Sequence, residues 1–181
     1  VQHCHLENHI SHAYTDDLDR IVIVSSTQIP HIARRIVSEA LDFPLSRIRV
    51  IKPFIGGGFG NKQDVVLEPM VAFLTMKLSG RSVRINMSRE ECMLCTRNRH
   101  PFFLDIQTGV NRDGTITARS LDAVSLTGGY ASHGHSIAAA GGAKMSSLYP
   151  RAVTAYHART VYANIPVAGA MRAYGSPQVL Y

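Results

Sequence analysis

The chain has 181 residues, of which 45% are hydrophobic and 18% charged, a balance that suits one globular domain or two small ones. Its 19 basic and 13 acidic residues give a formal net charge of +6, which favours an anionic ligand or an acidic partner. The basic residues form no stripe with aromatic residues, and no apolar run approaches the ~20 residues of a transmembrane helix, so composition argues against nucleic acid and membrane as partners.

The first half of the chain alternates the patterns of strands and helices. Short apolar runs predict three strands, at residues 21–24, 48–51 and 82–87. Residues 31–41 carry apolar side chains at helical spacing. A glycine loop, Gly56–Gly60, follows the second strand, and we expect Asp64 to cap a helix that runs to Leu78. This alternation predicts mixed α and β layers, with a βαβ-type core over about residues 18–90.

The second half predicts a hairpin followed by less regular chain. Residues 102–110 and 115–124 alternate around a Gly-containing turn. Residues 126–144 are rich in Gly, Ala, Ser and His and are apolar enough to be buried, but they show no clear period. Residues 160–164 favour another strand. We assign a second part of the chain to about residues 100–181.

The glycine loop Gly56–Gly60 is the most informative local feature. Glycines at this density let a backbone approach a ligand closely and point N–H groups at an anion. A phosphate-binding P-loop requires Gly directly before its Lys, but Asn61 precedes Lys62. A dinucleotide-binding G-x-G-x-x-G motif fails because Asn61 or Gln63 stands at its final glycine. Spacing alone therefore leaves two interpretations open, a ligand-binding loop and a tight turn between strand and helix.

Two short motifs imitate a zinc site. His5–Glu7 and Cys92–Cys95 resemble the two halves of the zinc deaminase signature. That signature has Pro before its first Cys, where Glu91 stands here, and the halves are far apart in sequence. We therefore favour hydrogen-bonded histidines and ordinary cysteines on a short helix, with no metal-ligating residue. The three cysteines form no disulfide framework and fit a reducing cytoplasm.

Four longer motifs follow one another along the chain: Ser26–Gln28, Gly57–Gln63, Arg99–Phe102 and Ala170–Gln178. In their order and spacing they resemble the molybdenum hydroxylases of the xanthine dehydrogenase/aldehyde oxidase family, over essentially the whole chain. The resemblance implies an α+β fold, the mixed α/β layers of that family's molybdopterin-binding domain. The chain begins without Met and ends as a helix pattern opens, so we expect an internal fragment of the molybdopterin-binding subunit.

The resemblance implies that this chain contacts a molybdenum–pterin cofactor through two loops. The implied cofactor-binding residues are Gln28, Gly58, Phe59, Gly60, Met171 and Arg172. The amide of Gln28 corresponds to one that hydrogen-bonds an oxo ligand of molybdenum, and the loop backbones supply further neutral donors. Gln63 and Tyr174 correspond to positions that contact substrate.

The resemblance also implies what other parts of the enzyme supply. The family's catalytic glutamate corresponds to a position beyond Tyr181, so we assign no catalytic residue and expect the chain alone to be inactive. Iron–sulfur clusters and FAD are expected on other domains or subunits of an oligomeric cytoplasmic enzyme. The pterin is expected to carry a nucleotide tail.

Two departures from the family pattern bear on the substrate. Gln63 stands where purine oxidases carry a carboxylate, and Ala138–Gly142 occupies the neighbourhood of their substrate-binding arginine. The resemblance implies hydroxylation of a purine-like N-heterocycle or an aldehyde, with water as the oxygen source. Because an amide carries no charge, we expect weak turnover of xanthine. The alternatives are a cofactor-free binding or assembly module of the same fold and a zinc enzyme.

Overall fold

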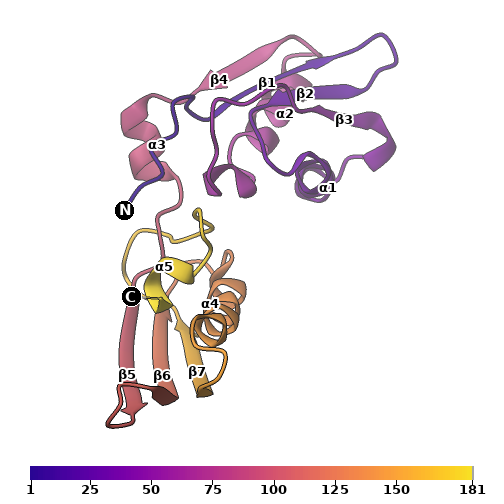
Figure 1. The fold of residues 1–181 in the computed structure, drawn as a ribbon. Coiled ribbons are helices and arrows are strands. Elements are labelled where there is room, and N and C mark those ends of the chain that lie inside the picture. The colour runs from indigo at the N-terminus through magenta and orange to yellow at the C-terminus, as the bar shows by residue number, and fades with distance from the viewer. Residues whose placement is uncertain (181) are drawn as a thin grey trace. The chain divides into compact units, whose positions relative to one another are not determined.

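The computed structural model describes residues 1–180, which separate into two compact units (Figure 1). One unit is formed by Gln2–Thr96, and the other by Val1 with the chain from Arg97 onward. Each unit combines a β-sheet with helices and has its own hydrophobic core. The expectation of an α+β fold is therefore confirmed.

The Gln2–Thr96 unit is built on a four-stranded mixed sheet. Its strands are β1 (Ile10–Thr15), β2 (Ile21–Ser25), β3 (Ile48–Ile51) and β4 (Val83–Asn86), in the spatial order β3-β2-β1-β4. β1 lies in the sheet interior and runs antiparallel to β2 and β4. β2 and β3 are parallel, and the chain between them forms helix α1 (Pro30–Leu41), which is the expected βαβ unit.

Two helices contribute to the core of this unit. α1 and α2 (Glu68–Lys77) both pack against the sheet and against each other. The buried cluster combines side chains of the sheet and of both helices: Ala13, Ile21, Ile23, Val37, Ile48, Val71 and Ala72. The remaining elements are α3 (Arg89–Cys95) and two short 3₁₀ helices, η1 (Leu45–Arg47) and η2 (Asn61–Gln63). η2 follows the glycine loop directly, and two of its three residues, Asn61 and Lys62, are buried.

The expected start of the second helix was wrong. The backbone of Asp64 is extended and Asp64 is not the N-cap of α2, which begins at Glu68 with Leu67 as its N-cap. The carboxylate of Glu68 accepts hydrogen bonds from the N–H groups of Val66 and Leu67, and it also accepts from the hydroxyl of Ser25. The buried carboxylate of Glu68 therefore fixes the turn that leads into α2, but it accepts from N–H groups in front of the helix and not from those of its first turn.

Strand β1 has no counterpart in the sequence prediction. Between Ile10 and Tyr14 it carries Ser11, His12 and Ala13, small or polar side chains where an interior strand usually has large apolar ones. Ser11 and Ala13 are nevertheless fully buried, because β1 lies between two strands and beneath α2. Packing against the neighbouring strands and α2 therefore stabilises this strand, although its own sequence pattern is weak.

The second unit contains a three-stranded sheet in the order β5-β6-β7. The strands are β5 (Phe102–Val110), β6 (Ile116–Leu126) and β7 (Val153–Val161). β5 and β6 form the expected antiparallel hairpin, with an irregularity at Gly109/Val110. β7 is parallel to β6, and helix α4 (Gly134–Leu148) makes the crossover between them. A short helix, α5 (Ser176–Val179), packs against α4.

Helix α4 covers most of the stretch that shows no clear period in sequence. Its glycines are explained by close packing: a Cβ on Gly142 would lie 2.3 Å from Cδ1 of Tyr156, and one on Gly141 would lie 3.1 Å from Cγ1 of Val179. Glycine lowers helix propensity, so the glycines that this packing needs weaken the helix pattern in the sequence. The strand expected at 160–164 was misplaced, because β7 ends at Val161.

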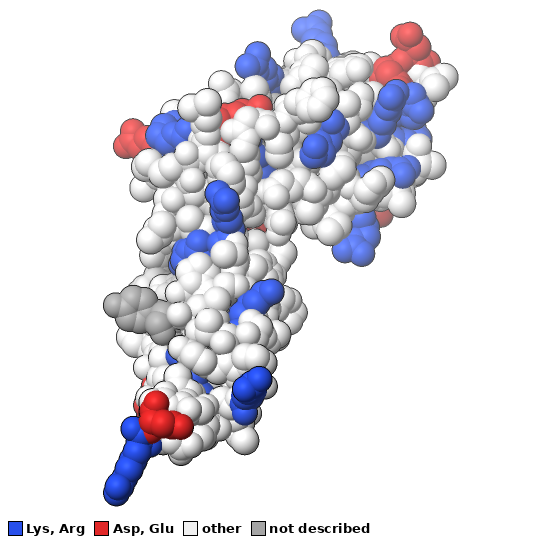
Figure 2. Space-filling model, in the orientation of Figure 1, with Lys and Arg blue, Asp and Glu red and all other residues white. Residues whose placement is uncertain are grey.

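The basic residues do not gather on one element. Figure 2 shows Lys and Arg at many separate places on the visible face, in line with their scatter along the sequence. Among the helices described between residues 1 and 180, none combines the length and the apolar character required to cross a membrane.

Candidate functional site

The glycine loop adopts a backbone shape that few residues tolerate. Gly57, Phe59 and Gly60 have positive φ angles of 90°, 51° and 102°. Phe59 is not a glycine, so its left-handed conformation is strained and is held by the surrounding structure. Within the described chain, no acceptor receives the N–H groups of Gly57, Gly58 or Phe59. The loop therefore presents neighbouring backbone donors to a polar or anionic ligand.

Gln28 lies beside this loop, in the turn between β2 and α1. Its backbone N–H donates to the carbonyl of Lys62 at 2.8 Å, and its side-chain Oε1 accepts from the N–H of Gly60 at 3.0 Å. A backbone N–H can only donate, so this contact fixes which end of the amide faces the loop. The NH₂ end of Gln28 has no acceptor among residues 1–180 and is available as a donor.

Gly58 is a glycine because the Gln28 side chain passes directly over it. A Cβ at Gly58 would lie 2.4 Å from Oε1 and 2.8 Å from Cδ of Gln28, which no real structure tolerates. Sequence reasoning attributed this glycine to a cofactor. The structure gives it a second requirement, since any side chain at Gly58 displaces the amide of Gln28.

Gln63 ends the short helix that follows the loop. Its N–H donates to the carbonyl of Gly60 at 3.0 Å, and it is half-buried. Its side-chain amide has no hydrogen bond within the described residues, so both its donor and its acceptor can serve a ligand. Gln28, Gly58, Phe59, Gly60 and Gln63 thus form one cluster within the Gln2–Thr96 unit.

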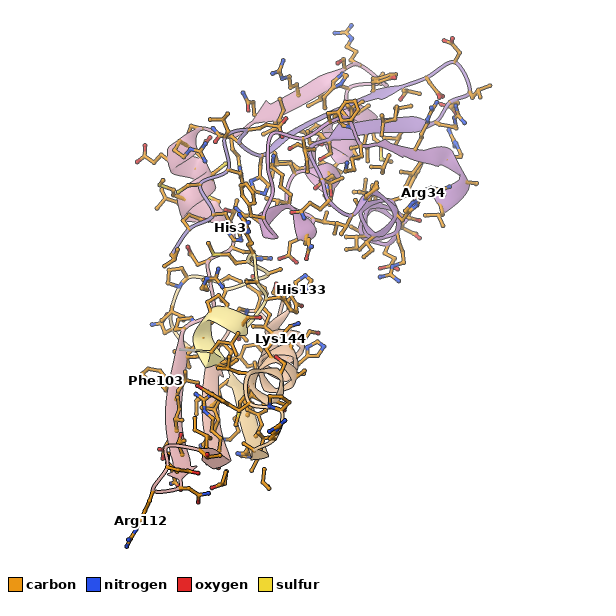
Figure 3. All side chains as sticks on the ribbon, viewed as in Figure 1. His3, Arg34, Phe103, Arg112, His133 and Lys144 are labelled. Carbon is orange, nitrogen blue, oxygen red and sulfur yellow. The ribbon has the colours of Figure 1, made fainter. Side chains whose placement is uncertain are left out.

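The other predicted residues lie on a tight loop in the second unit. The N–H of Tyr174 donates to the carbonyl of Met171 at 2.9 Å, and both Ala173 and Tyr174 have positive φ angles. Arg99 donates to the carbonyl of Arg172 at 2.9 Å and so fastens the loop. The Tyr174 hydroxyl lies 2.9 Å from Nδ1 of His133, the residue before α4 that is labelled in Figure 3. Met171, Arg172 and Tyr174 are therefore neighbours on one ordered loop.

The histidines near the start of the chain are hydrogen-bonded, as predicted. His5 bonds to the carbonyl of Glu7 through Nδ1, and Nδ1 of His9 lies 3.7 Å from Sγ of Cys92. Cys92 is buried on α3, whereas Cys95 is exposed. Within residues 1–180, no three His, Cys, Asp or Glu side chains are arranged to hold a metal ion. The Cys92–Cys95 motif and His5 therefore offer no zinc site in the part of the chain that the structure describes.

Burial of His9 predicts an acid-sensitive fold. Burial, reinforced by the positive charge of His5, lowers the pKa of His9 from 6.5 to about 4. As pH falls below 6.5, the unfolded chain binds a proton that the folded chain does not, so stability decreases. One unit of pKa corresponds to about 1.4 kcal/mol, so the loss reaches about 3 kcal/mol by pH 4.

Denaturant titrations between pH 7 and pH 4 measure this loss. The His9→Asn variant is the control, because asparagine does not titrate and its stability should depend less on pH. An equally steep pH dependence in His9→Asn would assign the acid sensitivity to other groups.

The sequence did not reveal that Glu7 and Lys62 are paired. Glu7 was considered as part of a zinc-like motif, and Lys62 as a phosphate-binding lysine and as part of the Gly57–Gln63 motif, yet the side chain of Lys62 is completely buried against Glu7. A lysine directly after a glycine loop is expected to be exposed, and only the three-dimensional contact reveals its partner.

These observations define the class of protein: an α+β module whose strained loop offers neutral hydrogen-bond donors but no metal ligand. The chain belongs to the molybdopterin cofactor-binding domain family, whose profile matches residues 1–181. The expectation from sequence is confirmed at this level.

Individual relatives and structures agree with this membership. The chain is 62% identical over its full length to the xanthine dehydrogenase molybdenum-binding subunit of Escherichia coli O157:H7, and it spans 24% of that relative. It is 33% identical to the nicotinate dehydrogenase large molybdopterin subunit of Eubacterium barkeri, covering 98% of this chain and 42% of the relative. The aldehyde oxidoreductase of Desulfovibrio desulfuricans has the same fold, with a TM-score of 0.91, 24% identity, and coverage of 98% of this chain and 20% of that one.

Proposed function

We propose that this chain supplies cofactor-binding loops to a molybdenum-dependent hydroxylase that oxidises a purine-like N-heterocycle, with water as the source of oxygen. The observation that carries the proposal is the arrangement of Gln28 over Gly58 and Gly60. It combines one side-chain amide donor with open backbone N–H groups, at a glycine where a Cβ would displace that amide.

These residues fit a molybdenum–pterin group. Its oxygen, sulfur and phosphate atoms are acceptors, and the residues of the loop itself, Gly56–Gly60, offer backbone donors and carry no thiolate, carboxylate or imidazole of their own. When bound, the group supplies the redox chemistry, accepting two electrons as a substrate C–H bond is replaced by a C–O bond.

The residues of this chain bind and orient rather than transfer protons. The NH₂ of Gln28 donates to an acceptor of the group, and the N–H groups of Gly57, Gly58 and Phe59 donate to its polar edge. Because Gly60 holds Oε1 of Gln28, the donor direction is set before the group arrives, which makes it a preorganised site. We propose, from the resemblance to the family, that Met171 and Arg172 are also cofactor-binding residues and that Tyr174 packs on the substrate.

The relatives support an N-heterocycle over an aldehyde. Two of them are a xanthine dehydrogenase subunit and a nicotinate dehydrogenase subunit, and xanthine and nicotinate are both N-heterocycles. The 62% identity to a xanthine dehydrogenase subunit argues against the weak xanthine turnover expected from Gln63. We therefore propose that Gln63 binds a purine edge through neutral hydrogen bonds in place of a charged one.

Replacing Gln63 with alanine is expected to weaken substrate binding more than chemistry. The KM for a purine should rise about tenfold, which corresponds to the loss of one or two hydrogen bonds, while kcat changes little. Steady-state kinetics of the complete enzyme with xanthine, hypoxanthine and nicotinate measures this. Gln107→Ala, which removes an exposed amide from β5, is the matched control. An unchanged KM for every substrate would remove Gln63 from the substrate site.

The electrons must leave through partners. The chain has three cysteines, fewer than the four thiolates that an ordinary iron–sulfur cluster needs. We propose that iron–sulfur and flavin domains or subunits of a cytoplasmic, oligomeric enzyme receive the electrons.

Isotope labelling tests the proposed reaction. Turnover of the complete enzyme in ¹⁸O-enriched water should place the heavy isotope in the hydroxylated product. Product labelled from ¹⁸O₂ instead would assign a different class of oxidation.

A further inference from the structure

Lys62 is the second residue of η2, the short helix that follows the glycine loop, and its side chain is fully buried. Its Nζ lies 2.6 Å from Oε2 of Glu7, whose side chain is 32% exposed. Burying an ammonium group without a partner costs a large amount of free energy, so the buried position of Lys62 requires the carboxylate of Glu7. The two residues are 55 positions apart in sequence, and the pair therefore joins the N-terminal segment to the loop.

Glu7 binds the other end of the loop as well. The same Oε2 accepts from the N–H of Gly56 at 3.1 Å, and the backbone N–H of Glu7 donates to the carbonyl of Gly56 at 3.0 Å. A Cβ on Gly56 would lie 2.6 Å from Cβ of Glu7, so this glycine is needed for the approach of the N-terminal segment. One carboxylate therefore fastens Gly56, before the strained residues, and Lys62, after them.

Lys62 also fixes Gln28. Its carbonyl accepts the backbone N–H of Gln28 at 2.8 Å, and the side chain of Gln28 in turn accepts from Gly60. A continuous set of contacts thus runs from Glu7 through Lys62 to the amide that offers its NH₂ to a ligand. The side chain of Lys62 is fully buried and its Nζ contacts Glu7, so this ammonium group is not exposed to solvent.

We propose that Glu7 and Lys62 are a positioning pair, which holds the loop Gly56–Gly60 and Gln28 in the shape that binds the cofactor without touching the cofactor. This inference rests on the proposed function for its effect on cofactor binding. The restraint of the loop itself does not depend on that function.

The test uses the complete enzyme with Glu7→Ala, Glu7→Gln and Lys62→Met. Glu7→Gln keeps an acceptor for Gly56 and Lys62 but removes the charge, and Lys62→Met removes the buried cation without leaving it unpaired. Asp16→Asn is the matched control, because it breaks another ion pair of the same unit, Arg20–Asp16 at 2.8 Å, which has no contact with the loop.

Two readouts separate positioning from general stability. Pterin content should fall about tenfold in Glu7→Ala and Lys62→Met, the low end of what loss of a supporting contact costs a bound group, with partial recovery in Glu7→Gln. Amide hydrogen exchange at residues 56–62 should become faster in the same variants, while exchange in β2 stays as in Asp16→Asn. Exchange is measured before cofactor loading, so it reports on the loop alone.

Each outcome decides one point. Faster loop exchange with lower pterin content supports the pair. Unchanged loop exchange in Glu7→Ala and Glu7→Gln overturns it, whatever the pterin content. A wild-type enzyme that contains no pterin overturns the proposed function, and loop exchange then still decides whether the pair restrains the loop. Should Glu7→Ala fail to fold, Glu7→Gln and Lys62→Met give the same comparison.

Discussion

The Gly58→Val variant of the complete enzyme should fold but contain no pterin. The backbone at Gly58 has no positive φ, so valine meets no conformational barrier there, only a steric one. Its Cβ would lie 2.4 Å from Oε1 of Gln28, so the amide must move and its bond to the Gly60 N–H is lost. The added methyl groups then occupy the space in front of the open N–H groups.

The fold should survive this change. The clash falls on one half-buried side chain rather than on the core, so the cost of overpacking is about 1–3 kcal/mol. Gly129→Val is the matched control, because Gly129 has an ordinary φ and nothing within 4 Å of a built Cβ. Oxidative release of the fluorescent pterin gives the content of each variant. A normal pterin content in Gly58→Val would mean that the loop is an ordinary turn between strand and helix.

Gln28→Ala should lower turnover about 100-fold while pterin stays bound. The reason is the loss of a preorganised donor, for which a reduction of about 10²–10³ in kcat is typical. Pterin is retained because the backbone N–H groups of the loop are unchanged and alanine leaves the space open.

Gln28→Glu separates the two functions of the amide. A carboxylate still accepts from the Gly60 N–H, which holds the loop, but it has no NH₂ to donate. Both variants should therefore lose turnover. Full activity in Gln28→Glu would show that Gln28 only supports the loop, and full activity in Gln28→Ala would remove it from the site.

Local pattern was sufficient for much of the fold. The short apolar runs that become β2 and β3, and the helical spacing of α1, are determined by the faces that they bury, so sequence reasoning identified them. Strand β1 and helix α4 were missed because packing overrides local preference. Ser11 is buried by neighbouring strands, and the glycines of α4 are required by Tyr156 and Val179.

The candidate site divides in the same way. The glycine loop and Gln28 are recognisable as motifs, since a close backbone approach leaves a mark in sequence. The pairing of Glu7 with Lys62 leaves no such mark, because 55 residues separate two ordinary charged side chains. Similarly, only the contact between Gly60 and Oε1 of Gln28 reveals which end of the amide is free to donate.

The central claim is that this chain forms part of the binding site for a molybdenum–pterin group. Elemental analysis and pterin quantification of the purified complete enzyme test it most directly, with Gly58→Val measured beside the wild type. We expect molybdenum and pterin in equal, near-stoichiometric amounts in the wild type and neither in the variant. Zinc in place of molybdenum, or a wild-type enzyme without metal and pterin, would contradict it.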